Sequence, residues 1–487
     1  MGSFILIPIV TPFLGGLFIR HSQDNRKIYR RTILTVVFNL IAFFFTIFFL
    51  KESSFELLKV NQYFSMSFKI DKMGMFFSSM ASILWVFTTF YAISYMDHEI
   101  KQKRFFFYFT ITLGVVIGLA FSANLFTLYF FYELLTLVTF PLVFHAETKE
   151  AFASGKKYLI YSFGGAAFVL GGMALLFSIS PEMKFVELGG LNEIYSSLNS
   201  VEKSKALISF ILMFLGFGVK AAIVPFHSWL PAAMVAPTPV SSLLHAVAVV
   251  KSGIFALIRL VYFVFGASVV KDMHGGYYAS FLIVPTILMG SLLAISHDNL
   301  KKRLAYSTIS QLGYIVLGIM MLNENALTGG LLHLINHALI KIVLFFCAGA
   351  IYVQAHEKNI SGMRGIGRKM PKTLWCFTIA SISLIGLPPS NGFVSKWYLA
   401  LGGLHASKIF LPIVLLLSAF LTASYLLPVI ITAFFPGEEK INYEEKLCDP
   451  ENKMMIPIIA ITCIVVFIGI FPNFILNIVE AITNEIL

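Results

Sequence analysis

The chain has 487 residues, of which 58% are apolar and 13% are charged. Soluble domains are about half apolar and a quarter charged, so this composition excludes an ordinary soluble enzyme. The formal net charge of +11 does not indicate a nucleic-acid partner, because lysines and arginines are also abundant in the cytoplasmic loops of membrane proteins. We therefore predict an all-α membrane protein that crosses the lipid bilayer many times.

Apolar runs bounded by charged residues mark the expected spans, each of which needs about 20 residues. In chain order they are 3–19, 32–50, 73–95, 105–121, 123–145, 158–180, 206–224, 238–265, 277–296, 304–322, 326–352, 373–401, 409–435 and 454–481. These are about fourteen helices, and residues 122–124 must form the tightest turn. No run alternates polar and apolar residues as a barrel strand does, so the spans are predicted to form a helical bundle.

Lysines and arginines are distributed unevenly between the loops. They gather after the odd-numbered spans, as at Arg26–Arg31 and Lys301–Arg303, and are sparse after the even-numbered ones. The positive-inside rule then places these basic loops in the cytoplasm and both termini outside a cell inner (cytoplasmic) membrane. The first span has no basic segment before it, so we expect it to be retained rather than cleaved as a signal peptide.

Two spans contain helix breakers. The span 206–224 runs into Pro225 and Pro231, and the span 373–401 contains Pro388 and Pro389. Broken helices free backbone groups that must face protein or water, and in transporters they often build an ion site. The two broken spans are five positions apart in order, which fits a repeat of five helices. The predicted organisation is N-terminal helices, a first repeat, a second repeat, and an acidic loop with the last helix: 1–97, 98–265, 266–435 and 436–487.

Ionisable residues inside spans are the candidates for function, because a charge at bilayer depth is costly and is rarely kept without a role. Those well inside predicted spans are Glu133, Lys220, Lys251, Arg259, Lys341 and Lys396. We interpret Arg259 as a side chain that snorkels towards a membrane interface. His333, His337 and Lys341 recur every four residues and so form one polar stripe on a helix. The residues His245 and His227 are secondary candidates.

Cofactors are not expected in this chain. Its cysteines are scattered and form no paired motif, which argues against an iron–sulfur cluster within the chain. The two histidines of the stripe have no third ligand nearby in the sequence, so we predict no metal site.

Several stretches carry a resemblance to a known family. They are Phe131–Leu135, Gly218–Pro231, Ala236–Lys251, Asp298–Gln311, His337–Lys341 and Gly386–Pro389. Over roughly residues 100–400, the chain resembles the antiporter-like subunits shared by complex I, Mrp-type sodium/proton antiporters and membrane-bound hydrogenases. The resemblance implies two inverted five-helix repeats and a chain of charged residues that transfers protons within the membrane. The residues that fall on this chain are Glu133, Lys220, Lys251, His333, His337, Lys341 and Lys396.

The resemblance also implies partners. It predicts other integral membrane subunits of one complex, a peripheral redox arm in the redox-driven branches, and H⁺ with or without Na⁺ as the transported ion. The M type of complex I usually has a glutamate where this chain has Lys396, and we expect no counterpart of the long lateral helix of the L type. The Mrp D subunit, the hydrogenase subunit and the N type of complex I remain open. So do two other functions, a non-pumping scaffold for a redox module and a carrier for an organic substrate.

Overall fold

A computed structural model describes the chain except residues 1, 51–52, 62, 183 and 436–446. Within the described residues, 10 helical segments are long and apolar enough to cross a membrane. They are η1–α1 (Gly2–Arg20), α2 (Asn25–Phe49), α3 (Lys72–Met96), α4 (Gln102–Ala120), α5 (Leu125–Val143), α6 (Lys149–Phe177), α13 (Gly275–Ser296), α15 (Glu324–Ala355), α18 (Phe410–Phe434) and α19 (Asn452–Ile470).

Other helices complete the bundle. The longer ones are α8 (Ser200–Lys220), α10 (Thr238–Ala246), α11 (Val249–Ile258), the π-helical η3 (Arg259–Phe265), α14 (Leu300–Met320), α16 (Pro371–Ile385), α17 (Asn391–His405) and α20 (Asn473–Ile486). The short ones are α7 (Asn192–Tyr195), α9 (Trp229–Ala232), η2 (Ala233–Val235), α12 (Ala267–Asp272), η4 (Ile360–Met363) and η5 (Ile366–Arg368).

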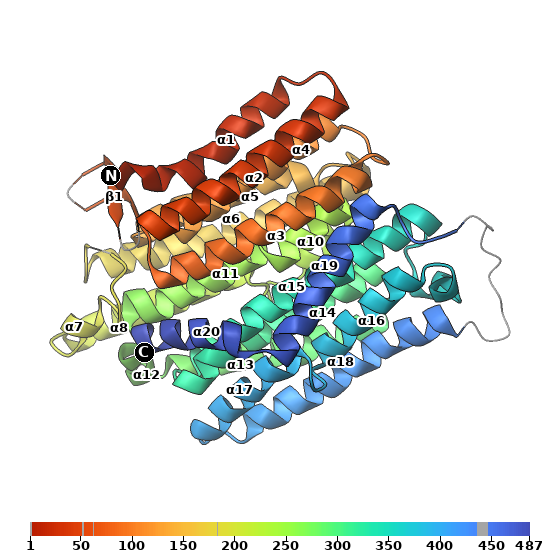
Figure 1. Cartoon of the computed structure of the whole chain (residues 1–487). Helices are drawn as coiled ribbons and strands as arrows, with labels where there is room; N and C mark the ends of the chain where they lie inside the picture. The colour runs from red at the N-terminus through yellow and green to blue at the C-terminus, as the bar shows by residue number, and fades with distance from the viewer. Residues whose placement is uncertain (1, 51–52, 62, 183, 436–446) are drawn as a thin grey trace.

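The long helices pack side by side, with α1 and α2 at one edge of the bundle and α18 at the other (Figure 1). Helix α15 lies in the middle and contacts α10, α14, α16, α17 and α19. In its most apolar stretch 94% of the residues are buried, as expected for a helix that other helices surround. The N-terminus and the C-terminus lie at the same end of the bundle (Figure 1).

Polar caps fix where several of the helices begin. The predicted turn at residues 122–124 is confirmed, because α4 ends at Ala120 and the side chain of Asn124 accepts a hydrogen bond from the Thr127 amide at 2.7 Å to begin α5. Ser390 caps α17 in the same way. Such caps satisfy amides that would otherwise lack a partner in the bilayer.

Both expected helix breaks are confirmed. Helix α8 ends at Lys220, and α16 ends at Ile385 before α17 begins at Asn391.

Three features differ from the expectations. The expected helix 238–265 is interrupted at Val247–Ala248, between α10 and α11.

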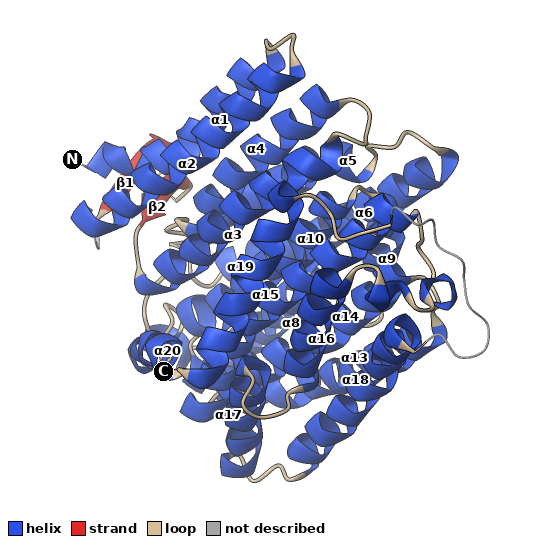
Figure 2. Ribbon diagram, turned by 45° about the vertical axis from the view of Figure 1, so that its right-hand side comes forward, coloured by secondary structure: helices blue, strands red, loops and turns tan. Residues whose placement is uncertain are grey.

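The other two differences lie near the chain ends. Residues between α2 and α3 form an antiparallel hairpin of β1 (Ser54–Lys59) and β2 (Ser65–Lys69), which Figure 2 shows at the end where α1 begins. The expected last helix 454–481 is two helices, α19 and α20, because Pro472 has no amide to continue the first one. Most of the expected acidic loop after residue 435 lies outside the described residues.

Candidate functional site

The break at the end of α8 is the centre of the candidate site. Lys220 is the last residue of α8, and the chain then runs without regular structure to α9. The indole nitrogen of Trp229 donates to the Val219 carbonyl at 2.9 Å, and the Val224 amide donates to the Thr286 hydroxyl at 2.9 Å. These contacts satisfy backbone groups that the break leaves without helical partners. Side chains of the protein therefore stabilise the break.

The Lys220 amine faces α5 and meets Glu133 there. Its Nζ lies 3.6 Å from Glu133 Oε1, with 1% of the lysine side chain and 18% of the glutamate side chain exposed. The same amine donates to the Tyr132 carbonyl and lies 3.4 Å from the centre of the Tyr132 ring. Two opposite charges at this separation attract by about 4 kcal/mol at an effective dielectric constant of 20. The predicted acid and base are therefore brought together.

Lys251 lies on α11, directly behind the break. Helix α11 packs against the end of α8 so closely that a Cβ at Gly253 would lie 2.5 Å from the Ala221 amide nitrogen. The Lys251 side chain is 0% exposed, and its amine has no hydrogen-bond partner among the described residues. An ammonium left unpaired at such a depth is expensive, so this position favours either a neutral amine or a water partner.

The polar stripe of α15 is confirmed as a buried row with hydrogen-bond partners on two other helices, α14 and α17. His333 bonds through Nδ1 to Ser395 Oγ at 2.9 Å and through Nε2 to Gln311 Oε1 at 3.0 Å. The ring of His337 lies 6.0 Å from that of His333, centre to centre. Lys341 donates to the Leu304 carbonyl at 3.0 Å. The stripe thus connects α14, α15 and α17.

Lys396 lies at the second helix break. Its Nζ donates to the carbonyls of Leu384 and Ile385, at 2.7 and 2.8 Å, which are among the last carbonyls of α16. These carbonyls have no helical partner and carry the negative end of the helix dipole, so they suit a cation. The amine also lies 5.3 Å from the centre of the Tyr314 ring.

Of the two secondary candidates, only His227 has a described side chain. His227 lies in the break between α8 and α9 and is half-buried. His245 belongs to α10, and its side chain is outside the described part of the structure.

The expectation for Arg259 was wrong. Its guanidinium does not extend into water; it is 0% exposed and forms a two-pronged ion pair with Asp71, at 2.6 and 2.7 Å. Phe255 and Phe263 lie against its face, with ring centres 4.9 and 4.3 Å away. The charge of Asp71, just before the third span, is visible in the sequence. No sequence pattern, however, links Asp71 to Arg259, because the two lie far apart along the chain. The pair ties the start of α3 to η3.

We expect this ion pair to matter for stability rather than for transport. In Arg259→Met, Asp71 keeps its buried charge without its partner, which should lower the free energy of unfolding by about 3–5 kcal/mol. Adding Asp71→Asn removes that charge, and asparagine can still cap α3 as Asp71 does. The double variant should therefore recover most of the loss. Thermal unfolding in detergent checks this, and a double variant as unstable as Arg259→Met would contradict it.

Sequence reasoning missed the neutral partners of the candidate residues. Gln311 and Ser395 are two of them. Other neutral pairs lie near the candidates: the hydroxyls of Thr139, on Glu133's helix α5, and of Tyr158, on α6, lie 2.8 Å apart. Asn336 and Asn391 bond to each other across α15 and α17, at 3.1 Å. Serine, threonine and asparagine are common in spans and have no charge to mark them, so only their placement reveals them.

Comparisons with known proteins agree on one family. The model of the family described as "NADH:quinone oxidoreductase/Mrp antiporter, TM" matches residues 122–422. Subunit N of the NADH-quinone oxidoreductase of Desulforudis audaxviator is 33% identical over 384 residues, which cover 76% of this chain and 75% of that protein. The chloroplastic NAD(P)H-quinone oxidoreductase subunit 5 of Phaseolus vulgaris is 32% identical, but the match covers only 49% of its length.

A solved structure shows the same fold. A chain in the Mrp complex from Dietzia superposes with a TM-score of 0.86 over 100% of this chain and 97% of that one, at 19% sequence identity. The matched family segment runs from the start of α5 into α18, so it contains every candidate residue named above.

Proposed function

This chain belongs to the NADH:quinone oxidoreductase/Mrp antiporter transmembrane family, and from that premise and the geometry above we propose that it moves protons as one subunit of a membrane complex. The proposed carriers are the side chains of Glu133, Lys220, Lys251, His333, His337, Lys341 and Lys396. A scaffold without transport is less well supported, because so many buried charges would be kept at a cost in stability and without use.

The observation that carries the proposal is the Glu133–Lys220 contact at a helix break. Burial disfavours the charged form of an amine, whereas a nearby carboxylate favours it. While the two side chains are in contact, the Glu133 carboxylate stabilises the charged, protonated form of Lys220. When the carboxylate moves away, the attraction of about 4 kcal/mol is lost, and the proton passes to the next acceptor. Opening and closing of this pair is the proposed switch.

The next proton acceptors lie at the two helix breaks and on α15. Lys251 has an amine beside the α8 break with no hydrogen-bond partner among the described residues, and a water molecule there would join it to Lys220. The imidazole of His333 can take a proton at one nitrogen and release one at the other, and both nitrogens already have hydrogen-bonding oxygens. Lys396 lies at the far end, on the α16 carbonyls. None of these steps needs a cofactor or metal in this chain.

The proposed topology has about fourteen spans. It adds α8, α10–η3, α14 and α16–α17 to the ten long apolar helices, and it treats α19 with α20 as one broken span. Spans 4–8 and 9–13 would form two inverted repeats, residues 98–265 and 266–435. The basic loops face the cytoplasm and both termini lie outside, in agreement with chain ends at the same end of the bundle (Figure 1).

The proposed partners are other integral membrane subunits. A relative is named as a subunit of a quinone oxidoreductase and a structural neighbour belongs to an Mrp complex, so two ways of driving transport fit. In one, a peripheral redox arm drives proton pumping; in the other, proton movement is coupled to Na⁺. Purification of the intact complex and identification of its subunits decides between them, because only the first includes redox proteins.

Lys251→Met provides the test of proton transport. Methionine fills a similar volume and removes an unpaired buried amine, so the complex should be as stable as the native one or more so. Its initial rate of pH-gradient formation in vesicles should fall at least about 10-fold, in line with the loss of a proton-transfer group. Lys103→Met, which changes an exposed lysine in the first turn of α4, is the matched control. An assembled Lys251→Met complex with the native rate would favour the scaffold.

A further inference from the structure

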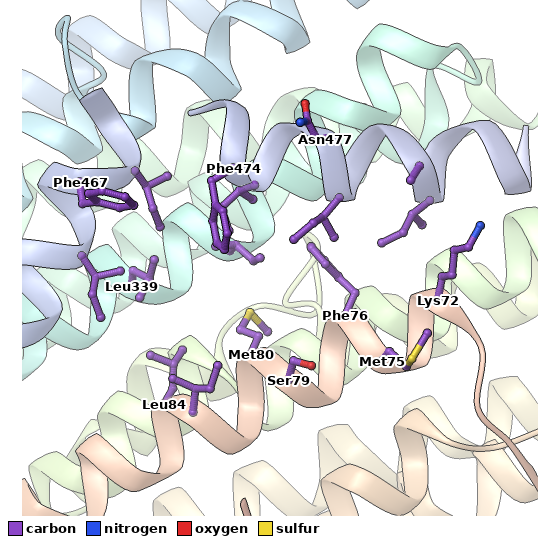
Figure 3. A pocket seen from close by; sticks show the side chains of 18 of the residues that line it. Lys72, Met75, Phe76, Ser79, Met80, Leu84, Leu339, Phe467, Phe474 and Asn477 are labelled. Carbon is purple, nitrogen blue, oxygen red and sulfur yellow. The ribbon is translucent and has the colours of Figure 1, made fainter. Parts of the chain in front are cut away.

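An apolar groove opens on the side of the bundle between α3, α15, α19 and α20 (Figure 3). Its volume is about 760 Å³. Met75, Phe76 and Met80 of α3 line one wall, and Phe474 and Ile478 of α20 line the other. The walls belong largely to helices that are apolar enough to span a membrane, so the groove faces the lipid rather than water.

The groove is about one lipid leaflet deep. Along α3 its lining runs from Lys72 to Leu84, a rise of roughly 18 Å at 1.5 Å per residue. Half of the hydrocarbon core of a bilayer is about 15 Å. Lys72 is the first residue of α3, so it marks the end of the groove at the membrane surface, and Leu84 lies near the bilayer centre.

The lining of the groove suits hydrocarbon chains. It is apolar apart from Lys72, Ser79 and Asn477. Flexible hydrocarbon chains fit such a space, and the two methionines can adjust to them because their side chains are unbranched and polarizable.

The surface end of the groove carries one charge of each sign. Lys72 and Glu485 form an ion pair there, with 41% and 19% of their side chains exposed. Figure 3 shows the Lys72 side chain extending towards α20. A partly exposed ion pair is worth only about 0–1 kcal/mol, so each member can exchange its partner for another charged group at little cost.

We propose that this groove binds one phospholipid with a zwitterionic, amine-bearing headgroup, of the phosphatidylethanolamine class. The phosphate oxygens accept hydrogen bonds from the Lys72 ammonium, and the headgroup ammonium donates to the Glu485 carboxylate. The acyl chains fill the groove between α3 and α20. The lipid thereby holds α20, which Pro472 separates from α19, against the bundle. This site does not depend on the proposed transport function.

The test is lipid retention by the purified complex, measured by native mass spectrometry and lipid extraction. The native complex should retain about one phosphatidylethanolamine per chain. Ser79→Trp and Ala481→Trp place an indole in the groove from opposite walls, and each should reduce the retained lipid at least 10-fold. Leu416→Trp is the matched control, because Leu416 is 72% exposed on α18, outside the groove.

A second measurement probes the headgroup. Native complex incubated with mixed vesicles of phosphatidylethanolamine and phosphatidylglycerol should retain the former preferentially, and Glu485→Gln should lose that preference several-fold while still binding lipid. Equal retention by the native complex and both tryptophan variants would overturn the proposal. So would a native complex that retains only quinone or phosphatidylglycerol, or in which another subunit crosslinks to Ser79→Cys in place of lipid.

Discussion

Replacing Lys220 with alanine should abolish ion pumping while the complex still assembles. The amine is the only partner within ion-pair distance of Glu133 among the described residues, and it is nearly inaccessible to solvent. Alanine removes the group that binds and releases the proton at the break. Loss of a proton-transfer group typically costs a factor on the order of 100 or more. The measurement is the initial rate of pH-gradient formation by reconstituted complex at equal subunit content.

The Lys220→Arg variant distinguishes the effect of a positive charge at this position from the effect of proton transfer by the side chain. Arginine retains a positive charge beside Glu133 but does not release its proton in proteins. It should therefore assemble as well as the native chain and pump as poorly as Lys220→Ala. Lys205→Ala, a change of another lysine on α8, should leave the rate unchanged. A Lys220→Arg complex with near-native pumping would mean that Lys220 only supplies a fixed charge.

The sequence predicts those parts of the site whose residues, charged side chains and helix breakers, are unfavourable inside a membrane span. Glu133 and Lys220 stand out because charges are rare in spans, and the breaks after Lys220 and Ile385 stand out because glycine and proline disrupt helices. The four-residue spacing from His333 to Lys341 requires one face of one helix. Each of these expectations uses local sequence alone. The structure confirms the two breaks and the shared, buried face of His333, His337 and Lys341 on α15, whereas the roles of these residues stay predictions.

The remaining features depend on contacts between distant segments. Arg259 pairs with Asp71 only because α3 and η3 pack together, and no local pattern carries that information. The interruption at Val247–Ala248 contains neither glycine nor proline, so it has no sequence signal of the usual kind. The groove between α3 and α20 exists because the helix bends at Pro472 and α20 continues along α3 towards Lys72. Packing, rather than composition, determines all three.

Glu133 and Lys220 should behave as one unit when both are changed. Glu133→Gln leaves the Lys220 amine buried without its counter-charge, and Lys220→Ala leaves Glu133 without its cation, so either change removes the switch. We expect Glu133→Gln to reduce transport nearly as much as Lys220→Ala, and the double variant to be little worse than either, because residues in direct contact are not additive.

Glu133→Asp completes the comparison. Aspartate keeps the charge on a shorter side chain, so the carboxylate still attracts the Lys220 amine across the 3.6 Å contact but from farther away. Because the attraction falls with distance rather than vanishing, transport should be partial, between the native rate and that of Glu133→Gln. The four variants are compared by initial rates of pH-gradient formation at equal complex content. Losses that multiply in the double variant, or a Glu133→Gln complex with the native rate, would show that the two residues act separately and that the switch lies elsewhere in the bundle.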